Sequence, residues 1–133
     1  MVWTGWPLER GVLLLAGLLF LGIFTQVTMF HSRQNFRFPS QWVPVVATPV
    51  LGALALLLVV SPSPAVRALF GPLLWVGAAA GVYGGVVHFL GVGQRVEGYR
   101  SYNFLVGPPV VLPLTITLVS LLAMLALRRM GTP

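Results

Sequence analysis

The chain has no cysteine, no lysine and only two acidic residues among its 133 positions. Without cysteine it cannot form a disulfide, ligate an iron–sulfur cluster or build a cysteine-type zinc site. Charged residues make up 8% of the chain, against about 25% in a typical soluble domain. So few polar side chains cannot cover a water-soluble globule, and we therefore expect most of the surface to face lipid.

The net charge of +6 is carried by arginine alone. In a nucleic-acid-binding domain the basic residues cluster on one hydrophilic face. Here they stand at the ends of apolar runs, which is where membrane proteins place them. We therefore expect the lipid bilayer, and no nucleic acid, as a partner.

Four apolar runs are long enough to cross a bilayer, which takes about 20 helical residues. They predict spans at about 11–31, 42–60, 69–90 and 109–127 within one domain, 1–133. The runs are continuously apolar rather than alternating, and a barrel needs at least about eight strands, so the spans are helices. The first run is full length and leads into an arginine-bearing segment, which favours a retained span over a cleaved signal peptide.

Short connections between the spans predict antiparallel neighbours, and so an all-α bundle of up-down-up-down topology. We call the side with the connections at 31–41 and 91–107 face B, and the side with the termini and the 61–68 connection face A. The arginines divide equally between the faces: Arg10, Arg67, Arg128 and Arg129 on face A, and Arg33, Arg37, Arg95 and Arg100 on face B. The free amino terminus tips the balance toward both termini inside, in the cell membrane of a bacterium or archaeon.

The two halves of the chain share a pattern. His31 and His88 each close an apolar run, and an arginine-bearing connection and a helix opening with two spaced prolines follow each of them. This pattern is typical of a repeated helical hairpin, with the copies related by an axis along the membrane normal. Unrelated membrane hairpins also share arginine-flanked loops and proline at helix starts, so chance similarity stays the alternative.

The third span carries small residues spaced for close helix packing, at Gly77, Gly81, Gly84 and Gly85. In lipid, a small-x-x-x-small (GxxxG) pattern lets two helix backbones approach closely. At about 100° per residue His88 falls roughly 20° from Gly77, in the middle of this stripe. We therefore expect His88 to face another helix rather than lipid.

Two histidines at membrane depth are candidates for a function. One hypothesis is a b-type haem whose iron has His31 and His88 as axial ligands, with Arg33, Arg37, Arg95 or Arg100 pairing with the propionates. A related hypothesis is a quinone site, in which a histidine bonds a quinone oxygen. The competing interpretation is that both histidines are ordinary interfacial or packing residues.

The spans contain no Asp, Glu, Lys or Arg, although proton-coupled carriers usually need an intramembrane acid. No nucleophile–base pair or phosphate-binding loop is present either, so we do not expect a stand-alone enzyme. The leading hypothesis is a small multi-pass subunit or accessory protein that packs against other membrane subunits, or against itself, in a larger complex, plausibly a redox one. A haem- or quinone-binding module and a small oligomeric carrier or pore are the alternatives.

Overall fold

The computed structural model describes residues 2–131, and every regular element in this range is helical. The long helices are α1 (Leu8–Arg33), α2 (Trp42–Val60), α3 (Pro64–Gly93) and α5 (Val111–Arg129). The 3-10 helix η1 (Pro39–Gln41) precedes α2, and the short helix α4 (Ser101–Val106) lies between α3 and α5. All four long helices are long and apolar enough to cross a membrane. The predicted all-α fold with four membrane-spanning helices is confirmed, and the chain is an integral membrane protein.

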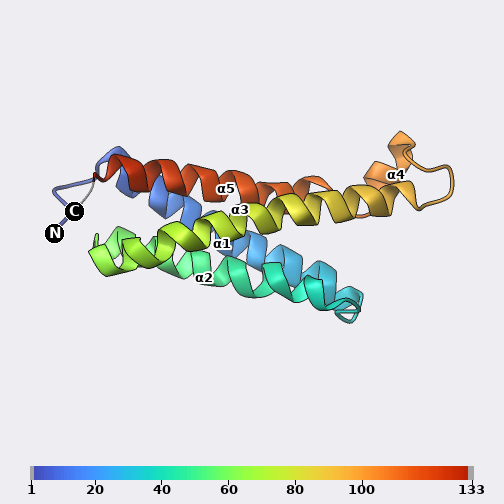
Figure 1. Ribbon diagram of the computed structural model, residues 1–133, viewed down its shortest axis with the longest axis horizontal. Coiled ribbons are helices and arrows are strands. Elements are labelled where there is room, and N and C mark those ends of the chain that lie inside the picture. The colour runs from blue at the N-terminus through green and yellow to red at the C-terminus, as the bar shows by residue number, and fades with distance from the viewer. Residues whose placement is uncertain (1, 132–133) are drawn as a thin grey trace.

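The long helices form two hairpins. Helix α1 packs along α2 and α3 packs along α5, while α1 against α5 and α2 against α3 join the hairpins. Figure 1 shows both termini at one end of the molecule, together with the connection from α2 to α3. The other two connections lie at the opposite end, where the hairpins diverge.

The apolar core is densest toward the termini, although it reaches Val27 of α1 and Val45 of α2 near the other end. Fully buried side chains near the termini include Leu13 of α1, Leu58 of α2 and Phe70 of α3. They lie early in α1 and α3 and late in α2, and so toward the face A end. The four helices are therefore held together most tightly at that end.

Polar contacts reinforce the face A end. The indole Nε1 of Trp3 donates to the carbonyl of Leu58 at 2.8 Å, and Arg10 Nε donates to the carbonyl of Val59 at 3.0 Å. Both interactions occupy carbonyls in the last turn of α2, which have no partner within the helix. An ion pair of 3.2 Å between Arg129 and Glu9 ties the end of α5 to the start of α1.

Two local features shape the connections at the face B end. Helix α5 begins at Val111, so Pro113 lies in its first turn, where proline removes no helical hydrogen bond. The connection from α3 to α5 contains the short helix α4. Because the other hairpin has η1 in the corresponding connection, the two connections differ in structure, and the hairpin duplication stays a hypothesis.

Candidate functional site

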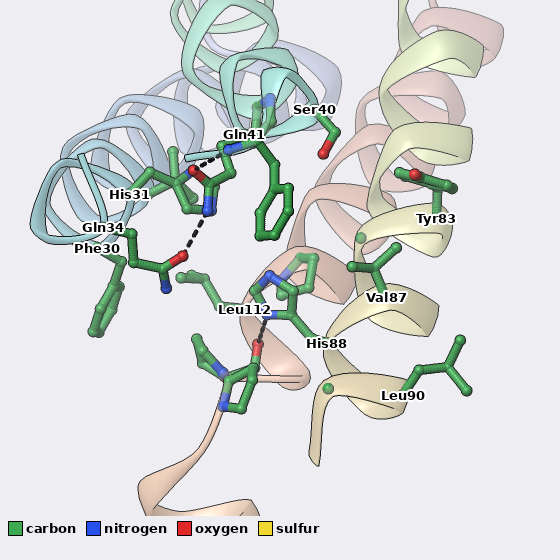
Figure 2. A pocket seen from close by; sticks show the side chains of 18 of the residues that line it. Phe30, His31, Gln34, Ser40, Gln41, Tyr83, Val87, His88, Leu90 and Leu112 are labelled. Carbon is green, nitrogen blue, oxygen red and sulfur yellow. Dashed lines mark hydrogen bonds between the residues drawn. The ribbon is translucent and has the colours of Figure 1, made fainter. Parts of the chain in front are cut away.

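A cleft of about 710 Å³ opens between the two hairpins at the face B end. Its walls come from the last turns of α1 and α3 and from the first turns of α2 and α5. Both histidines of the chain, His31 from α1 and His88 from α3, line it (Figure 2). The fold thus brings into one space two residues that lie 57 positions apart in the sequence.

His88 extends from α3 toward the start of α5 and is half-buried. Its Nδ1 lies 3.0 Å from the carbonyl oxygen of Pro109, and the dashed line in Figure 2 marks this hydrogen bond. The Pro109 carbonyl is free for it because Pro109 precedes the N-cap of α5, Val110, and so lies outside the ladder of helical hydrogen bonds. The start of α5 therefore supplies the acceptor that orients His88.

His31 is more deeply placed, with 8% of its surface exposed. Its Nδ1 is buried and makes no hydrogen bond within residues 2–131. Figure 2 shows the side chain of Gln41 beside it. The amide of Gln41 bonds Gln34 at 2.6 Å and accepts from the backbone N–H of Phe38 at 3.3 Å. A buried ring nitrogen without a partner is unusual in folded proteins, and a ligand would relieve it.

The four arginines predicted to accompany the histidines are not gathered together. Only Arg95 lines the cleft. The guanidinium groups of Arg33 and Arg37 lie over the rings of Phe30 and Phe38, at 6.0 and 5.5 Å from the ring centroids. The fourth, Arg100, is exposed and pairs with Glu97 at 3.1 Å.

The sequence-based analysis missed Asn103, which organises the connection beneath the cleft. This buried side chain donates to the carbonyls of Val96 and Gly98, at 2.8 and 2.7 Å, and accepts from Arg95 Nε at 3.4 Å. It thereby positions Arg95 and the residues that close the cleft on this side. An asparagine in a polar loop carries no pattern that would have revealed this role.

The glycine stripe of α3 lies against other helices. A Cβ on Gly81 would lie 2.7 Å from the carbonyl oxygen of Pro113, one on Gly84 would lie 2.8 Å from Pro113 Cβ, and one on Gly85 would lie 2.7 Å from Leu114. At Gly77 the obstacles would be Leu51 of α2 and Ser120 of α5. These glycines therefore allow α5 to approach α3, and the room in the cleft comes mainly from the divergence of the hairpins.

The rim of the cleft is apolar and faces outward. Five residues that line the cleft each expose more than a third of their own surface: Phe30, Val43, Tyr83, Val87 and Leu90. In a membrane-spanning helix, outward-facing side chains at this depth contact lipid. A lipophilic molecule could therefore enter sideways from the bilayer.

The polar groups of the cleft are imidazoles, amides, hydroxyls and one guanidinium. The hydroxyls belong to Ser40 and Tyr83, and the guanidinium to Arg95. The two glutamates lie elsewhere: Glu9 pairs with Arg129 at the face A end, and Glu97 pairs with Arg100 in the connection after α3. In the part of the chain that the structure describes, no group of three or more His, Cys, Asp or Glu comes together.

Comparison with protein-family models, with curated proteins and with solved structures gave no match for this chain. The functional proposal therefore rests on the residues of the chain itself and on their arrangement.

Proposed function

We propose that this membrane protein binds a lipophilic molecule of the quinone class in the cleft between its hairpins. The observation that carries the proposal is the meeting of His31 and His88 in one cleft that opens toward lipid. Small-molecule sites are typically clefts of roughly 300–1,000 Å³ with mainly apolar walls and a few polar groups. A volume of about 710 Å³ with two imidazoles fits this description.

A quinone matches the cleft in both of its parts. The head is a flat ring with oxygen-bearing groups at opposite ends, carbonyls when oxidised and hydroxyls when reduced, so one such group can meet each histidine. The apolar tail needs a path into the bilayer, and the exposed side chains of Phe30, Val43 and Val87 supply an apolar rim for it.

The b-type haem hypothesis has less support from the geometry. The two histidines do share a space, but only Arg95 of the four arginines accompanies them there. The glycines beside His88 on α3 lie mostly against other helices, so they leave little room for a macrocycle. A visible spectrum of protein purified from haem-replete cells discriminates between the hypotheses, because a Soret band would establish haem and contradict a quinone site.

Solvent extraction of the purified protein tests the quinone proposal. Protein isolated in native lipid discs is extracted and its quinone content per phospholipid is compared with that of the parent membrane. We expect enrichment toward one quinone per chain. A quinone-to-phospholipid ratio equal to that of the membrane would contradict the proposal.

We also propose that the protein acts as a subunit or accessory protein in a larger membrane complex. Support comes from Gln26, whose amide lies on the exposed side of α1. At about 1.5 Å per residue this amide is roughly 7 Å inside the end of the span at His31, where it would face lipid. Polar side chains at such depths commonly bond across to another helix. Purification from native membranes in mild detergent is the test, and a strictly monomeric, unaccompanied protein would contradict this role.

For its location we propose the cell membrane of a bacterium or archaeon, with both termini on the inner side. The amino terminus adds positive charge to face A, where the arginines otherwise balance those of face B. Reporter fusions at the carboxyl terminus and in the 94–100 connection test this orientation. An externally active reporter at the carboxyl terminus would contradict it.

A further inference from the structure

The hydrogen bond of His88 fixes what kind of group a ligand must present to it. A carbonyl oxygen can only accept a hydrogen bond, so at the 3.0 Å contact with Pro109 the Nδ1 of His88 must carry the hydrogen. A neutral imidazole has one N–H and one lone pair. The remaining nitrogen, Nε2, is therefore an acceptor, and it requires a donor from the ligand.

This assignment is supported by the backbone around Pro109. Helix α5 has Val110 as its N-cap, so the Pro109 carbonyl precedes the helix and accepts no backbone N–H within residues 2–131. The ring of His88 is the group that donates to it. Without this bond the half-buried Pro109 carbonyl would have no partner. This cost favours the tautomer that carries the hydrogen on Nδ1.

The second histidine also favours a hydroxyl. The Nδ1 of His31 is buried and has no partner within residues 2–131. A hydroxyl group both donates and accepts, so it can bond His31 in either tautomer, whereas a quinone oxygen serves only a donating nitrogen. A ring with two hydroxyls can therefore satisfy both histidines, and a quinone cannot satisfy His88.

We propose that the cleft binds the reduced, hydroxyl-bearing form of its ligand, a hydroquinone, in preference to the oxidised quinone. One hydroxyl donates to Nε2 of His88 and the other bonds His31. This inference rests on the proposed function, because it specifies the redox form that the quinone-class site takes. Binding alone is claimed, and no electron transfer is assigned to the chain.

The test compares the two redox forms of one ligand on the same protein. A benzoquinone with a decyl tail and its dithionite-reduced hydroquinone are titrated, without oxygen and at about pH 8.5, where histidine is ordinarily neutral, into the protein in lipid discs. Tryptophan fluorescence or calorimetry reports binding. The reductant leaves the protein covalently unchanged, because the chain has no cysteine.

We expect the hydroquinone to bind about fivefold tighter or more, since the quinone gives the Nε2 acceptor of His88 no hydrogen to bond. In His88→Phe, which keeps a ring but no acceptor, the two forms should bind equally.

Binding of both forms with equal affinity, or tighter binding of the quinone, would overturn the hydroquinone inference while leaving the proposed function in place. A preference that persists in His88→Phe would overturn the role of His88. Failure of both forms to bind the wild-type protein would overturn the proposed function, and the inference with it.

Discussion

At the scale of single residues, the carbonyl of Pro109 has the largest consequence. It orients His88 and determines which of its ring nitrogens is left for a ligand. The sequence allowed us to expect that His88 faces another helix, from its angle on the glycine stripe. The bond to Pro109 could not be predicted, because it depends on where α5 begins and on how closely α3 packs against α5.

Gln26 provides a second test at this scale. Replacing it with leucine keeps the size of the side chain but removes the amide, so we expect association with the partner helix to weaken by about 0.6–2 kcal/mol. Cross-linking yield or energy transfer between labelled chains and partners in lipid measures the change.

The neighbouring Thr25 offers a matched control. It is also exposed on α1, but its hydroxyl already donates to the carbonyl of Leu21 at 3.1 Å. Thr25→Val should therefore leave association unchanged. Equal effects of the two substitutions would mean that the amide of Gln26 makes no contact with a partner.

At the scale of elements, the close contact between α3 and α5 is the feature most sensitive to change. A Cβ added to Gly81 would lie 2.7 Å from the backbone of α5, at both Pro113 and Thr117. Thr117 itself donates across the interface to the carbonyl of Ala78 at 2.8 Å. Because backbone atoms cannot turn aside as a flexible side chain can, the two helices would have to separate.

We therefore expect Gly81→Ala to destabilise the fold by about 1–3 kcal/mol, the usual cost of overpacking. Unfolding in mixed micelles of increasing sodium dodecyl sulfate, followed by circular dichroism, measures this. Gly71→Ala in the same helix is the control, since a Cβ there meets nothing within 4 Å. An unfolding midpoint of Gly81→Ala that matched the control would contradict the packing described.

The four long helices could be predicted from the sequence, but the short helix α4 could not. Continuous apolar runs were sufficient to predict four membrane-spanning helices, because lipid demands long stretches without charge. The short helix α4 was not predicted, since its six residues lie in a polar connection without a helical period. It is held by the side chain of Asn103, which bonds backbone carbonyls that become neighbours only after folding.

At the scale of the whole molecule, the two ends differ in a way that the composition does not reveal. The face A end is closed by buried apolar residues such as Leu13 and Phe70, and by the contacts of Trp3 and Arg10 with α2. The face B end is open, and the cleft lies there. The sequence placed both histidines at this end but could not predict a cleft, because its volume depends on how far two separately packed hairpins diverge.

The central claim is that this cleft holds the ligand, and two neighbouring valines of α3 test it most directly. Val87 lines the cleft and Val86 does not, and both side chains are more than a third exposed, so tryptophan can replace either without entering the core. The measurement is the affinity of the decyl-tailed hydroquinone for each variant in lipid discs. We expect Val87→Trp to fill the cleft and abolish binding, and Val86→Trp to bind like the wild type. Undiminished binding by Val87→Trp would contradict the claim.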